Sequence, residues 1–430
     1  MRWRLVALFL TAAILLGGCS PMDEAPKSAG VDADTAKVLE IVHFIDAGGK
    51  KPYDARAFEM YQKFTEQTGV KIDIKTVPWD QLDERLLVAS QSGEPLGDLC
   101  AVSSQKVDYL VNGGALMPLN SWFDRRFKKE EFLPLVLQAG TSDFDGKLYL
   151  MLQSVHTRGL WYNKKYVTQP PRTLSELVET AEKAMAEHEG IYGLGFWGGT
   201  HYGAVEGTLS MLAWANGGSL AGKEGRATWA NEGVASGVRF MSDCVNRYGI
   251  SPKICLTTVD GLDVQEMFYN GKLAMIFDGS FAYSRNEFNY ESVEAYGFSP
   301  MPGVDGFSKN FSNGWAWGIP SNARQPDLAW SFIEWFESRE VQIEHAQLEG
   351  TLPTRVDALE DASFASSGFA PQFIEDLIGY GRPMDKFIYY QSALEALAAA
   401  STEYCLTPTI DLEKALTDSQ NLFNQKYYSS

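Results

Sequence analysis

Polar and aromatic side chains stand together where the sequence pattern predicts the end of a strand or the start of a helix. Trp79 and Asp80 begin a predicted helix, and a polar stretch at 153–158 separates two apolar segments that are predicted as strands. An aromatic ring offers a flat face on which a ligand can stack, and polar side chains supply hydrogen bonds in fixed directions. These residue types at such positions indicate binding of a small polar molecule.

Catalytic and metal-binding motifs are missing from the sequence. It contains neither the G-x-S-x-G turn of hydrolases nor the G-x-x-x-x-G-K-[ST] phosphate loop. The five histidines have no spacing typical of metal ligands, and the cysteines form no C-x-x-C pair. We therefore expect no metal, no cofactor and no enzymatic activity.

Length and composition indicate an acidic chain with two folded domains. The 430 residues suffice for two domains of ordinary size, and a content of 45% hydrophobic residues excludes a disordered chain. The formal net charge is −18. A surface of this sign lacks the basic patch that a phosphate backbone requires, so we expect no nucleic-acid partner.

The first residues have the pattern of an export signal. Arg2 and Arg4 precede an apolar core at 5–16, and Leu16-Gly17-Gly18-Cys19 matches the bacterial lipobox. We predict a lipoprotein signal peptide at 1–18, a diacylglyceryl (palmitate-type) lipid on Cys19, and a flexible polar tether at 19–37. The apolar core is shorter than the roughly 20 residues of a spanning helix, so membrane contact is expected through the lipid anchor only. A plain secretory signal or a short membrane anchor is the alternative.

Four more cysteines follow the lipobox: Cys100, Cys244, Cys255 and Cys405. Disulfides persist in exported chains, and Cys244 and Cys255 are close enough in sequence for a bridge between them. The alternative is four buried free thiols, which pack like small apolar side chains. Cys100 lies in an apolar strand and fits this alternative best.

The first part of the chain alternates between strand and helix patterns. The segments begin with a strand and switch type each time, at 38–45, 56–68, 70–77, 80–91 and 99–102. This order predicts a parallel sheet covered by helices. Ligands bind at the carboxyl ends of such strands, which are followed here by the loops 46–53, 78–80 and 103–105.

A second α/β unit is predicted after the polar stretch. Its helices are expected at 174–187, 204–214, 228–247 and 262–269. Its strands are expected at 192–197, 272–278 and 294–300, with a further apolar strand at 313–319. The last predicted helices are those at 326–337, 339–347, 392–402 and 412–427.

Four blocks of sequence occur in an order that can be compared with a known family. The blocks are EPLGDL at 94–99 with GGALMPL at 113–119, the crossing segment 145–167, FYNGKLAMIFDGSF at 268–281, and 311–319 with 329–333 and GTLPTR at 350–355. Together they resemble the family 1 extracellular solute-binding proteins, the sugar-binding lipoprotein subunits of bacterial ABC importers.

The resemblance implies an α/β, two-lobed periplasmic-binding-protein-like fold of the class II type, with the ligand cleft between the lobes. The expected N-terminal lobe comprises 38–152 and 312–370, and the expected C-terminal lobe comprises 156–300 and 375–430. Three crossings between the lobes are expected near 150–157, 299–312 and 365–380.

The resemblance and the strand ends together give the candidate ligand-binding residues. His156, Thr157 and Arg158 stand on the first crossing, where the family places a polar sugar contact, and Arg355 fills the family's L-P-x-R loop. The remaining candidates stand at the ends of strands and helices: Trp79, Asp80, Ser103, Ser104, Trp197, His201, Tyr202, Asp278, Phe281, Asn313 and Trp315. Core packing, helix capping or a surface ion pair is the structural alternative for each.

The implied function is capture of a carbohydrate outside the cytoplasmic membrane and its delivery to ABC permease subunits. The same role for a polyamine or a glycerol-phosphate-type solute stays open, because acidic residues are abundant and Arg158 and Arg355 suit a phosphate. A secreted carbohydrate-active hydrolase also stays open, since 55 acidic residues could include a catalytic pair. A receptor or adhesin that binds the solute for signalling is a further alternative.

Overall fold

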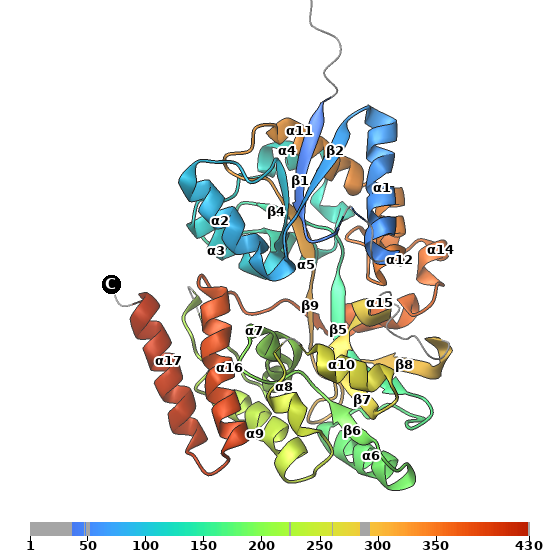
Figure 1. Ribbon diagram of the computed structural model, residues 1–430, viewed down its shortest axis with the longest axis vertical. Coiled ribbons are helices and arrows are strands. Elements are labelled where there is room, and N and C mark those ends of the chain that lie inside the picture. The colour runs from blue at the N-terminus through green and yellow to red at the C-terminus, as the bar shows by residue number, and fades with distance from the viewer. Residues whose placement is uncertain are drawn as a thin grey trace, which may run out of the picture. The chain divides into compact units, whose positions relative to one another are not determined.

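Alternating strands and helices fold into two sheets, each covered by its own helices, in the computed structural model (Figure 1). The structure describes residues 37–46, 48, 52–222, 225–259, 261–283 and 293–428. The predicted signal peptide 1–18, Cys19 and the predicted tether up to residue 36 lie outside the described residues. Part of the predicted ligand loop 46–53 does so too.

The first sheet has the strand order β2-β1-β3-β10-β4. Its strands are β1 (Val38–His43), β2 (Lys71–Thr76), β3 (Leu99–Ser103), β4 (Leu150–Leu152) and β10 (Trp315–Gly318). β1 is parallel to both β2 and β3, so the parallel pairing predicted for this part of the chain is confirmed. β10 returns from late in the sequence and lies antiparallel between β3 and β4.

Helices cover both faces of this sheet, and together they form what we call the first lobe (Figure 1). They are α1 (Pro52–Thr68), α2 (Leu82–Ser92), α3 (Val107–Asn112), α4 (Asn120–Arg126), α5 (Pro134–Gly140), α11 (Pro326–Phe336), α12 (Arg339–Glu349) and α13 (Val356–Leu359). The apolar stripe of α1 puts Tyr61 and Phe64 against Phe332 of α11, with ring centroids 5.6 and 5.2 Å apart. Trp317 of β10 packs edge-on against the same Phe332, which fixes the late strand in the sheet.

The second sheet has the order β11-β9-β5-β7-β6, with β8 also paired to β5. Its strands are β5 (His156–Asn163), β6 (Tyr192–Gly195), β7 (Leu273–Gly279), β8 (Tyr296–Ser299), β9 (Asn310–Asn313) and β11 (Gly381–Arg382). The second lobe is this sheet with α6 (Leu174–Glu187), α7 (Tyr202–Ala204), α8 (Ser210–Ala215), α9 (Glu232–Asn246), α10 (Leu262–Tyr269), α15 (Ala370–Tyr380), α16 (Tyr390–Leu406) and α17 (Leu412–Tyr428). The short helix α14 (Ala362–Ala365) precedes α15.

The chain crosses between the sheets from β4 to β5 and returns from β9 to β10. The return falls at Gly314, later than the predicted range 299–312, because Ser312 and Asn313 still pair with β5. A Cβ at Gly314 would lie 2.0 Å from the carbonyl oxygen of Ser154, so only glycine fits where the two crossing segments meet. The two-lobed fold is confirmed, while the exact lobe boundaries remain predictions.

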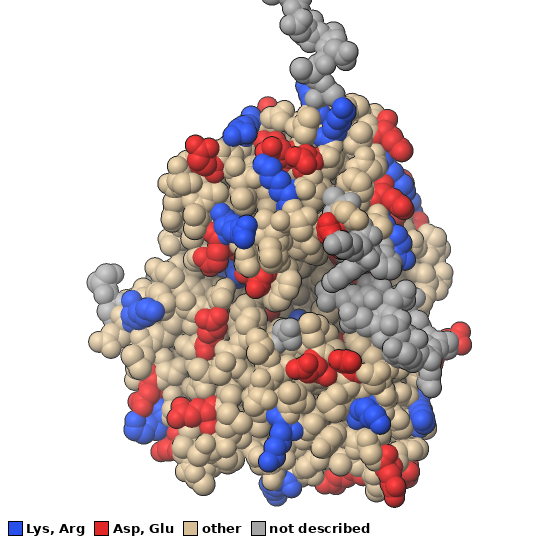
Figure 2. Space-filling view, in the orientation of Figure 1, with Lys and Arg blue, Asp and Glu red and all other residues tan. Residues whose placement is uncertain are grey.

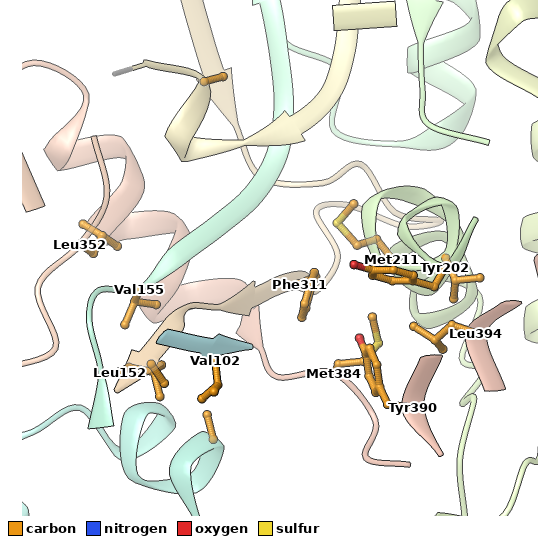
Figure 3. Packing of buried hydrophobic residues seen from close by; sticks show 14 of the residues in the cluster. Val102, Leu152, Val155, Tyr202, Met211, Phe311, Leu352, Met384, Tyr390 and Leu394 are labelled. Atoms are coloured by element: carbon orange, nitrogen blue, oxygen red, sulfur yellow. The ribbon is translucent and has the colours of Figure 1, made fainter. Parts of the chain in front are cut away.

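Buried apolar side chains fill both lobes and continue between the helices of the second lobe. Figure 3 shows Tyr202 of α7 and Tyr390 of α16 lying close together, with Met384 and Leu394 beside them. α16 is thereby fixed against the part of the second lobe that follows β6. Within the described part of the chain, no helix is long and apolar enough to cross a membrane.

The four described cysteines are buried free thiols, so the bridge considered between Cys244 and Cys255 is not formed. Cys244 is fully buried in α9, and Cys255 is fully buried in the following 3-10 turn. Burial raises the pKa of Cys255 to about 12, which keeps the thiol protonated and unreactive. Both side chains therefore act as small core residues.

Candidate ligand-binding site

A cavity of 240 Å³ lies between the two lobes, where β1 and β3 end and where β5 crosses. The face shown in Figure 2 is hollowed between the lobes. Many of the residues expected from the sequence line the cavity: Trp79, Ser103, His156, Arg158, Trp197, Tyr202, Phe281, Asn313 and Trp315. The position agrees with the rule that open α/β sheets bind ligands beyond the carboxyl ends of their strands.

Aromatic rings from both lobes face the cavity. Phe44 and Trp315 of the first lobe pack on each other with ring centroids 4.8 Å apart. Trp79 of the same lobe is 44% exposed and stands at the mouth. Trp197 and Phe281 belong to the second lobe. Rings on opposite walls can contact both faces of a flat ligand, which suits a molecule with apolar C–H surfaces.

The indole of Trp197 is held in place by its neighbours. It stacks on the imidazole of His201, with ring centroids 5.7 Å apart and planes 9° apart. A Cβ at Gly203 would lie 2.1 Å from Cη2 of Trp197, and one at Gly261 would lie 3.0 Å from Cδ2. These two glycines leave the space that the indole occupies, so the backbone of α7 and the turn before α10 set the position of the ring.

Arg158 brings a positive charge to the cavity, and a buried carboxylate balances it. Its Nη1 lies 4.0 Å from Oδ1 of Asp278, and its guanidinium lies over the ring of Phe281 at 5.4 Å. Asp278 accepts hydrogen bonds from Gln265 Nε2 at 3.0 Å and from the Gly279 N–H at 2.7 Å. Asp278 is therefore placed behind Arg158 and is not part of the lining.

Lys106 brings a second positive charge, which is also balanced. Its Nζ lies 3.1 Å from Oδ2 of Asp83 and donates to Oε1 of Gln391 at 3.3 Å. Lys106 and Asp83 are almost completely buried, so their mutual attraction is little screened. Asp83 also accepts the Ser103 N–H at 3.1 Å, which fixes the end of β3.

Glu206 is the acidic residue that lines the cavity. It stands in a π-helical segment, Val205–Leu209 (η4), between α7 and α8, and the wider turn aims its side chain into the site. Its Oε1 accepts from the Tyr390 hydroxyl at 2.7 Å and from Gln105 Nε2 at 3.3 Å. Burial raises the pKa of Glu206, although Tyr390 and the positive charges of Arg158 and Lys106 act in the opposite direction.

The side chains on the first crossing divide between the cavity and the interior. The hydroxyl of Thr157 is buried and donates to Asp376, which also accepts from Asn310. Thr157 thus ties β5 to α15 and does not line the cavity, contrary to the expectation. His156 does line it, with its ring 5.7 Å from that of Phe281 and its Nε2 3.7 Å from a carboxylate oxygen of Glu349.

Four further expected residues are absent from the lining. Asp80 and Ser104 stand next to lining residues in the sequence, but Ser104 is buried and Asp80 is exposed to solvent. His201 stacks on Trp197 and is itself not part of the lining. Arg355 lies over the ring of Phe132 and pairs with Glu131 at 3.2 Å and with Asp357 at 2.8 Å. The structural alternative of an ion pair is therefore the one realised for Arg355.

Several lining residues were not among the single candidates chosen from the sequence: Phe44, Gln105, Lys106, Glu206, Leu262 and Gln265. Gln105 lies in the predicted ligand loop 103–105, and Phe44 lies in the predicted strand 38–45, just before the predicted ligand loop 46–53. Glu206 and Gln265 lie inside predicted helices, where nothing in the local pattern distinguishes a ligand contact from a solvated face. For Glu206 the only local signal is that it is the one charged residue of the predicted helix 204–214.

Two other hollows are larger but lack the features of a ligand site. A groove of 730 Å³ lies between α16 and α17, and a cavity of 510 Å³ lies beside Arg382 and Asp385. The groove has small and charged side chains and only two aromatic rings, Phe423 and Tyr427. Among the residues that the structure describes, no group of three or more His, Cys, Asp or Glu side chains is arranged to hold a metal ion.

Two α/β lobes that enclose a cavity lined with aromatic and polar side chains define a solute-binding protein. The chain belongs to the bacterial extracellular solute-binding protein family, whose model matches residues 48–343. The resemblance found in the sequence blocks is thereby confirmed.

Comparison with individual proteins agrees with this assignment. The maltooligosaccharide ABC transporter solute-binding lipoprotein of Streptococcus pneumoniae strain R6 is 25% identical over 77% of this chain and 75% of its own length. The maltodextrin-binding protein MdxE of Bacillus subtilis is 23% identical over 67% of this chain and 69% of its own. Both relatives carry the names of binding proteins.

Solved structures show the same fold. A solute-binding protein of Thermotoga lettingae bound with α-D-tagatose has a TM-score of 0.79 and 21% identity, and the match covers 91% of this chain and 99% of that one. Maltose-bound MalE3 of T. maritima has a TM-score of 0.79 and 20% identity, over 90% and 99% of the two chains.

Proposed function

We propose that this protein captures a carbohydrate outside the cytoplasm and delivers it to the permease subunits of an ABC importer. The observation that carries the proposal is the cavity between the lobes, where rings from both sides enclose a set of hydrogen-bonding side chains. A sugar presents apolar C–H faces and a rim of hydroxyl groups, and this combination needs both kinds of partner. The names of the relatives from S. pneumoniae and B. subtilis support a sugar ligand.

The charges around the cavity favour a neutral sugar over the charged alternatives. Arg158 and Lys106 are each balanced by a buried carboxylate, so neither offers an uncompensated charge to a phosphate. Among the described lining residues Glu206 is the only acid, whereas a polyamine needs several carboxylates for its ammonium groups. A neutral ligand with many hydroxyl groups can bind without breaking the ion pairs of Arg158 with Asp278 and of Lys106 with Asp83.

A thermal-shift screen tests the proposal directly. Sugars, polyamines and glycerophosphodiesters are added to the purified protein, because a ligand that binds only the folded state raises its melting temperature. We expect stabilisation by a sugar, with little dependence on salt because no net charge is neutralised. Stabilisation confined to polyamines or phosphodiesters, and weakened by salt, would show that the solute is charged.

The proposal includes binding without chemical change. A glycoside hydrolase places an acid and a second carboxylate on either side of the scissile bond. Here Glu206 lines the cavity, while Asp278 and Asp83 stand behind it and are engaged with Arg158 and Lys106. Prolonged incubation of the protein with the sugar found in the screen should return it intact by chromatography. Release of new reducing ends would support the hydrolase alternative.

We also propose that lipidation of Cys19 holds the protein at the outer face of the cytoplasmic membrane, where the captured solute reaches the permease. A diacylglyceryl group provides two acyl chains, and two chains anchor a protein stably. Cys19→Ser should therefore move the protein from the membrane fraction to the medium or periplasm. A variant that stays with the membrane would show that the leader is a different kind of segment.

A further inference from the structure

We infer that the ligand cavity is closed at one end and holds the end of a sugar, one or two rings long. This inference rests on the proposed function and narrows it, because the sequence and the relatives leave the length of the sugar open.

The size of the cavity is the first observation. Its volume of 240 Å³ lies below the roughly 300–1,000 Å³ that is usual for sites of drug-sized ligands. A monosaccharide or a disaccharide fits such a space, whereas a chain of three or more rings needs an extended groove.

A wall between two cavities is the second observation. Lys106 lines the ligand cavity and also a neighbouring cavity of 170 Å³, whose other wall includes Tyr390 and Gln391 at the start of α16. Nζ of Lys106 donates to Gln391 at 3.3 Å, and the hydroxyl of Tyr390 donates to Glu206 at 2.7 Å. The first contact joins the first lobe to α16, and the second joins α16 to the segment that carries Glu206. Together they form the wall between the ligand cavity and the neighbouring cavity.

The wall is too firmly bonded to be opened by a sugar. Lys106 is 3% exposed and forms its ion pair with Asp83 at 3.1 Å, and Tyr390 is 1% exposed. Displacing Lys106 would leave the buried carboxylate of Asp83 without its partner, which is strongly unfavourable. A ligand ring therefore stops at Lys106 and Glu206 and does not extend into the second cavity.

The cavity is open to solvent where Trp79 and Leu262 line it, because these side chains are 44% and 50% exposed. Any ring beyond the second would extend past this opening into solvent. It would gain little contact, so additional length should contribute little to affinity.

Titration calorimetry with saccharides of increasing length tests the inference. The probes are glucose, galactose, mannose, maltose, cellobiose and lactose, with maltotriose, maltotetraose and cellotriose as the longer members. We expect a monosaccharide or disaccharide to bind, and its next longer homologue to bind within about threefold of it, well under the tenfold that corresponds to about 1.4 kcal/mol. Binding of trisaccharides alone, or a gain above tenfold from two rings to three, would overturn this inference but not the proposed function. No binding of any saccharide would overturn the proposed function itself.

A variant of the wall gives a second measurement. Lys106→Ala combined with Asp83→Asn removes the side chain at which a ligand ring stops and leaves no unpaired buried carboxylate. The affinity for a trisaccharide, relative to the matching disaccharide, should rise in this double variant. Gln372→Ala, at an exposed position of α15, is the control and should leave the ratio unchanged. An unchanged ratio in the double variant, with normal melting behaviour, would show that this wall does not limit the ligand.

Discussion

Trp315 illustrates how a single side chain in this cavity acquires a fixed orientation. It begins β10, is half-buried, and packs on Phe44 at the end of β1, so the ring is held from behind while one face meets the cavity. Because the ring is already ordered before the ligand arrives, little conformational entropy is lost on binding. Such rigid rings tend to dominate binding free energy.

Trp315→Ala should weaken sugar binding by about 2–4 kcal/mol, the range of aromatic hot spots. Calorimetry with the sugar found in the screen measures the loss. Trp335→Ala is the matched control, since Trp335 is a half-buried ring of α11 that bonds to Gln67 and does not line the cavity. Equal losses in both variants would point to general destabilisation and not to a stacking contact.

Asp376 illustrates a different role, in which a buried acid joins the two crossing strands to α15. Burial raises its pKa to about 7, although the bonds from Thr157 and Asn310 lower it. The ordinary value is 3.8, so folding takes up a proton between about pH 4 and pH 7. The stabilisation from this proton uptake is fully present below pH 4 and is lost as the pH rises through 7.

Asp376→Asn removes this titration. The free energy of unfolding of the native protein, minus that of the variant, should therefore fall by about 2–4 kcal/mol between pH 4.5 and pH 8, since each pKa unit corresponds to about 1.4 kcal/mol. Urea unfolding at several pH values gives this difference. Burial also raises the pKa of Glu337, to about 8. Because Glu337 is present in both proteins, its contribution to the pH dependence cancels in the difference between their free energies of unfolding. If the difference between the two free energies of unfolding did not change with pH, Asp376 would not have the raised pKa described above.

At the scale of elements, the short segments after β6 organise the second-lobe side of the cavity. The chain turns through His201, enters α7 and then widens into the π-helical segment η4. This arrangement points Glu206 into the cavity and leaves Gly203 under Trp197. A regular α-helix through the same residues would rotate Glu206 relative to the cavity wall.

Gly203→Ala tests whether this backbone positions Trp197. The added Cβ would lie 2.1 Å from the ring, so the indole must move. We expect at least a tenfold loss of sugar affinity, equivalent to about 1.4 kcal/mol, with the lobe still folded by circular dichroism. Gly379→Ala in α15 is the control, because its Cβ would meet nothing within 4 Å. Unchanged affinity in Gly203→Ala would mean that the position of Trp197 is not important for binding.

At the scale of the whole molecule, contacts across the cavity hold the lobes together. Gln105 of the first lobe donates to Glu206 of the second at 3.3 Å, and Lys106 donates to Gln391 of α16. Lys386, which precedes α16, donates to the Thr141 carbonyl and to Asp143, both at 2.8 Å. These few polar contacts, with two crossing strands nearby, suit a pair of lobes that opens and closes around a ligand.

Small-angle X-ray scattering should detect this closure. The radius of gyration of the protein without its leader and tether should fall when the sugar is added, because ligand contacts to both lobes favour the closed arrangement. A saccharide that fails the thermal-shift screen serves as the control. An identical scattering curve at saturating sugar would show that the lobes do not move on binding.

The sequence by itself determined the features that depend on short stretches of chain. Periodicity predicted α6 and α10 with the boundaries that the structure shows, and the parallel order of β1 to β3 followed from alternating strands and helices. Most aromatic site residues, including Trp79, Trp197 and Trp315, were predicted because strand and helix ends are local signals.

The tertiary structure alone decided which distant groups meet. The pairing of β10 with β3 and β4, the bonds of Thr157 to Asp376 and the ion pairs of Arg355 join residues far apart in the chain or depend on the packing around them. The direction in which Glu206 points depends on a π-helical turn that has no reliable sequence pattern. Such contacts depend on which groups are buried together and on competition among many alternative partners. Short stretches of sequence do not contain this information, so these contacts could not be predicted from them.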